Sequence, residues 1–435
     1  MGLTAERTLE IPSSGKSPLT GEALRRRISV RGPSTSKIFV MVTMALILAV
    51  GIFLRVYPSA GFKGIGFDEH AYMVFLKQIE MVGVPNYDAV VRVYVERQYK
   101  QPDAVVPATR IGFLAPAYFF GKLLHLSSFN ALRATNCGAG ILMLVLSGCF
   151  AYRMGGTGMM VGTTALVATA PLQIYLSQRA LIDGYFAFWA VLSLWLAWEN
   201  LQRPRHWGWL IAYTLSLAVL VLTKENAAFV VVAIFGVLLS NRWLRLGTLS
   251  PQLLVATLLG PTLALMLLAG MVGGAWEWAR FYQMFVAKSR TNFYSIFAQD
   301  GPWYRYLVDF ILMSPVVVVL AIGRIFQLRK ADRAEVFMTG FLVLNFIFMA
   351  SVTYGMSLRY AAYWDMLLCA LASSQILSLS RKFPKVRSTI LASGLILIVG
   401  MTGLSQYYRF FIKGEVYDPV TAALVRAADL QKSAK

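Results

Sequence analysis

Two adjacent carboxylates, Asp68 and Glu69, stand directly after the first apolar stretch of this 435-residue chain. Ionisable side chains at a membrane boundary are costly unless they meet water, a metal or a substrate. A low-dielectric boundary raises the proton affinity of a carboxylate, so Asp68 is predicted to act as a general base. Glu69 is predicted to bind a metal or to orient Asp68. The alternative for Asp68 is the N-cap of a helix over residues 69–82, and one residue can fill both roles.

Three further groups of charges stand at the ends of apolar stretches. Asp183 follows Arg179 by four residues, so a structural ion pair across one helical turn is one interpretation. Lys224 precedes Glu225 at an apolar edge, where a lysine often only extends its ammonium to lipid headgroups. Arg359 carries a planar fork of donors that suits the oxygens of a phosphate. These side chains are further candidates for a functional site.

The elements that must position these residues are predicted to be membrane-spanning helices. Hydrophobic residues make up 57% of the chain and the mean hydropathy is +0.59, far above the values of a soluble domain. The apolar residues gather in stretches of about 17 to 23, enough for a helix to cross a hydrocarbon core of roughly 30 Å. These stretches do not alternate as barrel strands do. The sequence therefore predicts an all-α polytopic membrane protein.

The net charge of +20 arises from 41 basic and 21 acidic residues. The basic residues lie mostly in short connections, where they orient a membrane protein and contact anionic lipid headgroups. They are not interleaved with stacking aromatics outside the apolar stretches, so nucleic acid is not predicted as a partner. Cys137, Cys149 and Cys369 lie in apolar stretches, without the spacing of a zinc site or a disulfide framework.

Eleven spans are predicted, at about 38–56, 130–151, 158–176, 184–200, 208–222, 226–241, 250–272, 303–323, 335–354, 360–379 and 388–404. The positive-inside rule places the Arg-rich connections in the cytoplasm only if the apolar segment 108–125 does not cross. That segment is therefore predicted to be re-entrant or to lie on the surface. Residues 1–37 are predicted to form a disordered basic cytoplasmic tail, 38–404 the transmembrane domain and 405–435 a short outer tail.

The first outer loop, residues 57–129, is predicted to carry two helices, 69–82 and 87–100, near the membrane surface. With this topology the acidic pair and the other candidate residues all fall on the outer side, which predicts a single external cavity. The centres of most predicted spans lack ionisable groups, which argues against an ion-coupled transporter.

The order of several short motifs resembles that of the GT-C fold of integral-membrane glycosyltransferases, over residues 38–380. The motifs are Phe67-Asp68-Glu69 after the first span, Phe113-Leu114-Ala115-Pro116-Ala117-Tyr118 leading into Leu132-Arg133, Tyr175 to Asp183, Leu222-Thr223-Lys224-Glu225, and Leu358-Arg359-Tyr360. The branch that they resemble holds protein O-mannosyltransferases, lipid A aminoarabinose transferases and related bacterial lipopolysaccharide-core transferases.

This resemblance implies an inverting glycosyltransferase that moves a sugar from a polyprenyl-phosphate-sugar donor to a hydroxyl of a glycan, lipid or protein acceptor. It implies the following roles: Asp68 and Glu69 catalytic, Lys224 and Arg359 binding the donor phosphate, and Asp183 and Arg179 orienting the acceptor or a metal. A divalent metal cation bound by Asp68, Glu69 or Asp183 is left open as a cofactor.

The expected location is the bacterial inner membrane, with membrane lipids as partners and the site facing the periplasm or exterior. Two other functions remain open. One is a transporter or flippase of lipid-linked or amphiphilic solutes, which predicts a pathway open to each side in turn. The other is a ligase of polysaccharide chains, which predicts a larger donor and a pyrophosphate leaving group.

Overall fold

The computed structural model describes residues 35–57, 65–104, 106–292, 295–329, 332–352, 355–414 and 419–427. The chain divides into two units, Met1–Val42 and Thr43–Lys435. In the first unit the described residues form the start of helix α1 (Thr35–Val56). Residues 1–34 of the predicted basic tail lie outside the described residues. Everything below concerns the second unit.

The described residues of the second unit are helical, with no strand among them, which confirms the predicted fold class. After α1 the helices are α2 (Phe67–Val82), α3 (Tyr87–Lys100), α4 (Ile111–Leu124), α5 (Ser128–Ala168), α6 (Pro171–Gln178), α7 (Ile182–Gln202), α8 (Trp207–Thr223), α9 (Ala227–Leu244), α10 (Pro251–Val272), α11 (Ala275–Thr291), α12 (Arg305–Met313), α13 (Pro315–Phe326), α14 (Arg333–Ala350), α15 (Ala362–Ser380), α16 (Lys385–Tyr407) and α17 (Pro419–Ala427). Four short helices join them: η1 (Val84–Asn86), η2 (Ser295–Gln299), η3 (Leu358–Ala361) and η4 (Tyr408–Lys413).

Seven helices in the described part are long and apolar enough to cross a membrane, or eight if a bent pair counts as one span. The predicted number of eleven spans is therefore not confirmed. Helix α4, which occupies the segment predicted to be re-entrant, has 14 residues. At 1.5 Å per residue it is about 21 Å long, which is too short to cross a bilayer by itself.

Helix α5 reverses its direction at Gly155 and Gly156. The backbone leaves helical geometry there, and Gly156 has a φ of 73°, which a glycine adopts without strain. The two arms then pack against each other so closely that a Cβ on Gly148 would lie 2.9 Å from Oγ1 of Thr164. This reversal matches the boundary predicted between the spans 130–151 and 158–176. The second arm, however, ends at Ala168, and the separate helix α6 begins at Pro171.

The span predicted over residues 303–323 is broken in the structure. Helices α12 and α13 meet there at an angle of 119°. Pro315 has no backbone N–H and restricts the residue before it to extended geometry, and Ser314 has φ −140° and ψ 59°. The helix therefore ends at Met313 and a new one begins at Pro315.

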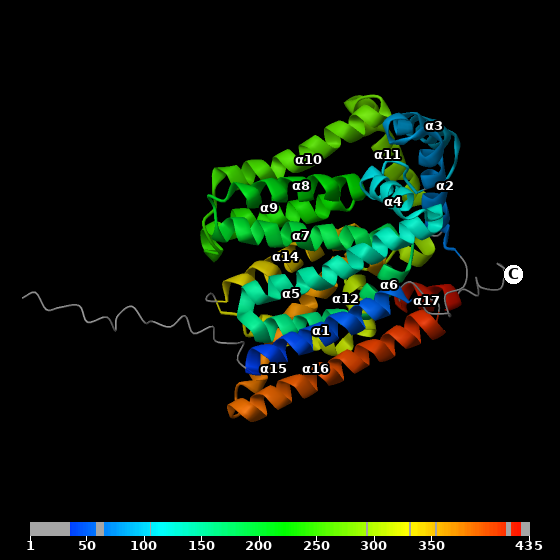
Figure 1. The fold of residues 1–435 in the computed structure, drawn as a ribbon. Coiled ribbons are helices and arrows are strands. Elements are labelled where there is room, and N and C mark those ends of the chain that lie inside the picture. Colours follow the sequence, from blue (N-terminus) through cyan, green and yellow to red (C-terminus); the bar gives the residue numbers. More distant parts are fainter. Residues whose placement is uncertain are drawn as a thin grey trace, which may run out of the picture. The chain divides into compact units, whose positions relative to one another are not determined.

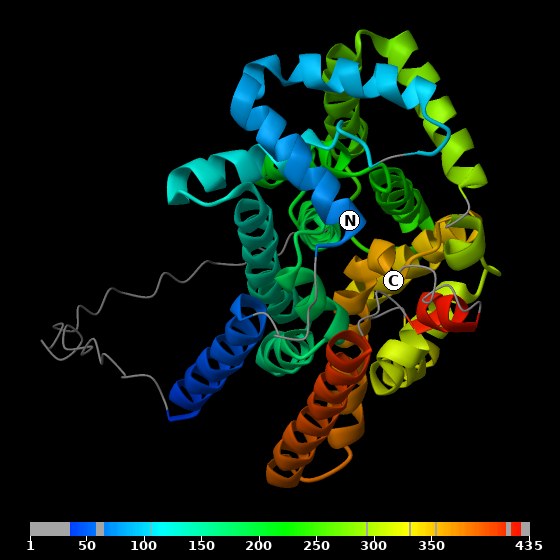
Figure 2. The same ribbon diagram turned by 90° about the vertical axis from the view of Figure 1, so that its right-hand side faces the viewer.

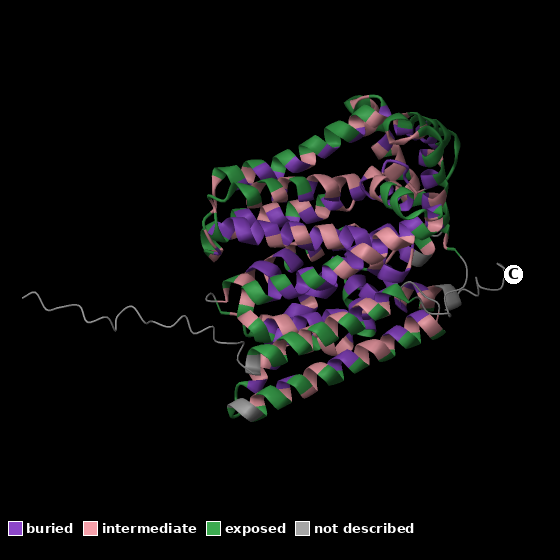
Figure 3. Cartoon of the chain, viewed as in Figure 1, coloured by how far each residue is buried: buried purple, intermediate pink, exposed green. Residues whose placement is uncertain are grey.

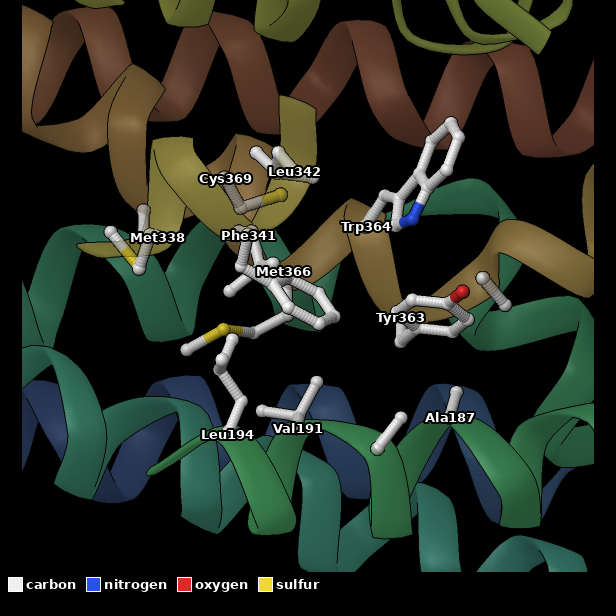
Figure 4. Packing of buried hydrophobic residues seen from close by; sticks show 14 of the residues in the cluster. Ala187, Val191, Leu194, Met338, Phe341, Leu342, Tyr363, Trp364, Met366 and Cys369 are labelled. Atoms are coloured by element: carbon white, nitrogen blue, oxygen red, sulfur yellow. The ribbon is translucent and has the colours of Figure 1, made fainter. Parts of the chain in front are cut away.

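The main hydrophobic core forms around α7, whose residues are buried along most of its length (Figure 3). Ala187, Val191 and Leu194 of α7 point toward Phe341 of α14 and Met366 of α15 (Figure 4). Helices α10 and α16 instead carry many exposed apolar side chains, as expected for surfaces that face lipid. A second, smaller cluster of buried apolar residues forms where α2, α3 and α4 pack together.

Helices α2, α3 and α11 lie at one end of the bundle, to the right in Figure 1 and toward the viewer in Figure 2. The connections between α7 and α8, α9 and α10, and α15 and α16 lie at the opposite end (Figure 1). Those connections contain Arg203, Arg205, Arg245 and Lys382. These basic residues therefore lie at the end of the bundle opposite α2 and α3.

Candidate active site

A cavity of about 780 Å³ opens at the end of the bundle that carries α2 and α3. Four residues that the sequence singled out line it: Asp68, Asp183, Lys224 and Arg359. They come from four segments that are far apart in the chain, namely the start of α2, the start of α7, the α8–α9 connection and η3. The convergence that the sequence predicted is therefore present in the structure.

Asp68 lies in the first turn of α2, and the N-cap of this helix is Gly66. The prediction that Asp68 caps a helix beginning at residue 69 is therefore wrong by two positions. Because Gly66 has no side chain, the carboxylate of Glu69 reaches back and accepts a hydrogen bond of 2.7 Å from its backbone N–H. A carboxylate in the first turn also interacts favourably with the helix dipole. The predicted helix 87–100 is confirmed as α3.

Arg359 links the two carboxylates of the cavity. Its Nη2 lies 2.6 Å from Oδ2 of Asp68, and its Nε lies 3.8 Å from Oδ2 of Asp183. Oδ1 of Asp183 accepts a hydrogen bond from the ammonium of Lys224. Asp183 and Lys224 are almost completely buried, whereas the Asp68 side chain remains 24% exposed. Asp68 is thus the carboxylate of this network that an incoming molecule reaches most easily.

The electrostatic surroundings shift two of these groups. Burial lowers the pKa of Lys224 to about 8, and the nearby Arg110 and Arg359 add to this shift while Asp183 opposes it. Burial acts to raise the pKa of Asp68, but the guanidinium groups of Arg359 and Arg110 outweigh it, so this pKa lies below its usual range. The raised proton affinity predicted for Asp68 from its place at a membrane boundary is therefore wrong. At neutral pH the cavity therefore contains an ionised carboxylate and a lysine close to its titration point.

Close packing of α4 on the end of α8 positions Lys224. A Cβ on Gly112 would lie 2.7 Å from the carbonyl carbon of Leu222 and 2.8 Å from the backbone nitrogen of Thr223. Only a glycine permits this approach. The Lys224 ammonium then lies 3.7 Å from the centre of the Tyr360 ring, a favourable cation–π geometry.

Arg110, which lies in the apolar segment 108–125 and was not among the predicted site residues, is a further cation of the cavity. It binds Glu225 through two hydrogen bonds of 3.4 and 2.8 Å and also donates to the hydroxyl of Tyr72. The Arg110 contact outweighs burial and holds the pKa of Glu225 below its usual range. An arginine inside an apolar, proline-containing segment is costly without a partner, and this cost was the signal that could have identified Arg110.

Glu69 and Arg179 form a structural ion pair. Arg179 donates to both carboxylate oxygens of Glu69, the Nε bond being 2.9 Å, and the backbone N–H of Ala180 donates to Oε1 over 2.8 Å. Glu69 is fully buried and does not line the cavity. These contacts fix the start of α2 to the α6–α7 connection. The catalytic role predicted for Glu69 and the acceptor-orienting role predicted for Arg179 remain untested.

The ion pair suggested between Arg179 and Asp183 depended on a continuous helical turn. Helix α6 ends at Gln178, Arg179 has extended geometry, and α7 begins only at Ile182. The four-residue spacing therefore does not bring the side chains together as it would within one helix. Arg179 binds Glu69, and Asp183 binds Lys224.

A metal site is not evident from the carboxylates of the cavity. Within the described ranges, no group of three or more His, Cys, Asp or Glu side chains could hold a metal ion. Oδ2 of Asp68 contacts Arg359, and the two oxygens of Asp183 face Lys224 and Arg359. These side chains do not fit the oxygen-rich ligand set that a divalent cation needs. The metal cofactor left open by the sequence remains untested.

A second cavity, of about 250 Å³ and mainly apolar lining, adjoins the first. Leu265 and Leu268 of α10 and Val231 and Val232 of α9 line it. Several residues line both cavities, among them Arg110, Lys224 and Phe285. The main cavity and the apolar cavity thus share two cations, Arg110 and Lys224.

Comparison with known proteins supports the predicted fold. The family model described as dolichyl-phosphate-mannose-protein mannosyltransferase matches residues 121–285. The apo oligosaccharyltransferase of Archaeoglobus fulgidus is similar in structure, with a TM-score of 0.59 and 13% identity over 89% of this chain and 56% of that one. The same enzyme, AglB, in complex with an inhibitory peptide and a dolichol-phosphate has a TM-score of 0.57 and 12% identity, over 88% of this chain and 56% of that one.

ArnT from Cupriavidus metallidurans bound to undecaprenyl phosphate has a TM-score of 0.54 and 14% identity, over 89% of this chain and 76% of that one. The chain spans little more than half the length of the archaeal enzyme. No curated protein sequence matches it. The resemblance in fold to the GT-C glycosyltransferases is confirmed, and part of the chain matches the mannosyltransferase family model.

Proposed function

We propose that this chain transfers a sugar from a polyprenyl-phosphate-sugar donor to a hydroxyl group of an acceptor. The observation that carries the proposal is the junction of the two cavities. At this junction Arg110 and Lys224 line both the apolar cavity and the main cavity, which also contains the carboxylate of Asp68. The solved structures of AglB and ArnT bound a dolichol-phosphate and undecaprenyl phosphate respectively, which supports the same class of donor here.

The shape of the junction suggests how the donor lies. A prenyl chain would pack against Leu265 and Leu268, where burial of apolar surface favours it. The phosphate that follows the chain would then lie at the mouth shared by both cavities, beside Arg110 and Lys224. Charge-assisted hydrogen bonds from both cations would hold it. This assignment adds Arg110 to the predicted phosphate-binding residues Lys224 and Arg359.

The chemistry needs one base and a stabilised leaving group. Asp68 takes the proton of the acceptor hydroxyl as its oxygen attacks the anomeric carbon of the sugar. The bond from that carbon to the phosphate oxygen breaks, and its electron pair stays on the polyprenyl phosphate. Lys224 and Arg110 stabilise the negative charge that develops there. Attack opposite the phosphate inverts the anomeric configuration.

The contact between Asp68 and Arg359 suggests how the base is activated. Arg359 lies 2.6 Å from Asp68 and lowers its proton affinity in the unliganded cavity. A donor phosphate would compete for the same guanidinium, because arginine binds phosphate in a bidentate manner. As Arg359 turns toward the phosphate, the proton affinity of Asp68 rises. The base would thus become effective only with the donor in place.

The distribution of basic residues indicates on which side of the membrane the site lies. The site lies at the end of the bundle opposite the Arg-rich connections, so we place it on the outer side of the membrane. This fits a bacterial inner membrane with the site facing the periplasm or exterior. The acceptor would be a glycan, lipid or protein hydroxyl that is present on that side.

The test is sugar transfer by the purified chain in lipid nanodiscs, supplied with a radiolabelled polyprenyl-phosphate-sugar and membrane extract as the source of acceptor. Asp68→Asn is expected to lower the single-turnover rate by about 10²–10⁴-fold, the usual contribution of a general base. The matched control is Glu80→Gln, which changes an exposed carboxylate of the same helix. Transfer by Asp68→Asn within threefold of the control would refute the assignment of the base. Movement of the intact donor across the bilayer without transfer would favour the flippase.

A further inference from the structure

We propose that a side chamber of about 220 Å³ next to the main cavity binds the sugar of the donor, and that it accepts a single neutral sugar ring. The inference rests on the proposed function and specifies its substrate. The chamber is lined by the start of α9, one face of α11 and residues of η2, α12 and α14.

The position of the chamber fits a donor sugar. Arg110, Lys224 and Phe285 line this chamber, the main cavity and the apolar cavity. A phosphate held by the two cations would therefore have the prenyl chain on one side and the sugar on another. Tyr360 lines both the chamber and the main cavity, where Asp68 lies. The anomeric carbon would lie at this boundary, within reach of an acceptor in the main cavity.

The polar groups of the chamber suit hydroxyl groups. Asn226 stands at the N-cap position of α9, but its side chain caps no backbone N–H of that helix. Gln299 is 9% exposed. Among the described residues neither side-chain amide has a hydrogen-bond partner. An amide offers both donors and an acceptor, so two of them can bind several hydroxyls of one ring.

Aromatic side chains supply the faces of the chamber. Tyr282 and Phe285 of α11, Tyr306 of α12 and Tyr360 of η3 line it. Tyr306 is 3% exposed and packs edge-on against Trp364, with ring centres 5.5 Å apart, so its ring is held in place. Rings of this kind pack against the C–H face of a sugar while their hydroxyls remain available for hydrogen bonds.

The charges of the chamber argue for a neutral sugar. Arg110 and Lys224 are the cations that we assign to the donor phosphate, and Glu225 is bound by Arg110 through two hydrogen bonds. A buried carboxylate or ammonium on the sugar would need an opposite charge of its own. The remaining polar groups that we assign to the sugar, Asn226 and Gln299, are neutral. The chamber is also much smaller than the main cavity of about 780 Å³, which suits one ring better than a longer glycan.

The experiment compares two phosphodiesters that carry the same charge, a polyprenyl-phosphate-hexose and a polyprenyl methyl phosphate, by equilibrium binding to the chain in nanodiscs. Glucose, mannose and galactose are used as the hexose. Wild type is expected to bind at least one hexosyl lipid about tenfold more tightly than the methyl ester. The double variant Asn226→Ala/Gln299→Ala is expected to remove this preference and to change binding of the methyl ester by less than twofold. Asn86→Ala, at an exposed position on η1, is the control.

A second variant distinguishes loss of the sugar subsite from misfolding of the protein. Asn226→Asp keeps the shape of the side chain and introduces a charge, so it is expected to weaken binding of the neutral hexosyl lipid and to strengthen binding of an aminosugar lipid. Equal loss of both ligands in the double variant would overturn the sugar subsite and leave the proposed donor class intact. Tighter binding of an aminosugar or uronic acid lipid by wild type would do the same. Failure of wild type to bind either the hexosyl lipid or the methyl ester would instead refute the proposed function.

Discussion

Lys224 gives the most quantitative prediction, because its pKa of about 8 lies within reach of ordinary buffers. If the protonated ammonium binds the donor phosphate, the affinity for the donor must fall as pH rises through this value. The protonated fraction is about 90% at pH 7 and about 10% at pH 9. The donor affinity of wild type is therefore expected to fall about tenfold between these two pH values. Neighbouring Arg110 stays charged throughout, because its pKa lies well above the usual value, burial being outweighed by Glu225.

The assay is equilibrium binding of a polyprenyl-phosphate-hexose in nanodiscs from pH 6.5 to 9.5. A phosphodiester is used because its own charge is constant over that range. Lys224→Arg keeps a positive charge at every pH, so its affinity is expected to vary by less than twofold. Lys224→Met is expected to bind weakly at every pH and to show no dependence.

Two results would refute this reasoning. The first is a wild-type affinity that stays constant from pH 7 to pH 9.5. The second is a tenfold fall in Lys224→Arg equal to that of wild type, which would assign the titration to another group. Thermal unfolding of each protein at pH 7 and pH 9 is the control for loss of structure.

Three further variants test other parts of the account. Glu69→Gln removes the fully buried carboxylate charge that pairs with Arg179, so a loss of about 3–5 kcal/mol in the free energy of unfolding is expected, seen as a lower midpoint of thermal unfolding; an unchanged midpoint would contradict the structural role. Gly112→Ala places a Cβ against the backbone of Thr223, so a destabilisation of about 1–3 kcal/mol and weaker donor binding are expected, and wild-type values of both would contradict the packing. Arg110→Met is expected to weaken donor binding at least tenfold while the exposed control Arg280→Met does not, and equal affinities would remove Arg110 from the phosphate site.

The sequence predicted which side chains lie together at the cavity better than how they pair. Asp68, Asp183, Lys224 and Arg359 could be predicted because ionisable groups at the ends of apolar stretches carry an energetic cost that needs a reason. Their placement on one side followed from the charge of the connections. Each pairing, in contrast, depended on backbone geometry. The helix break after Gln178 separates Arg179 from Asp183. No local sequence pattern indicates that Arg179 binds Glu69 instead.

The helices, likewise, were predicted from the sequence only in part. The all-α fold and the helix 87–100 followed from composition and periodicity. The bend between α12 and α13 was missed, although Pro315 is visible in the sequence, because hydropathy alone gives a continuous apolar stretch over both helices. The chamber beside Asn226 and Gln299 could not be predicted at all. Its residues come from segments far apart in the chain that only tertiary packing brings together.

The most direct test is an experimental structure of the chain with a polyprenyl-phosphate-sugar bound. The donor phosphate is expected to lie within hydrogen-bond distance of Lys224 and Arg110, with the prenyl chain against Leu265 and Leu268. A phosphate bound at the opposite end of the bundle, among the Arg-rich connections, would contradict it.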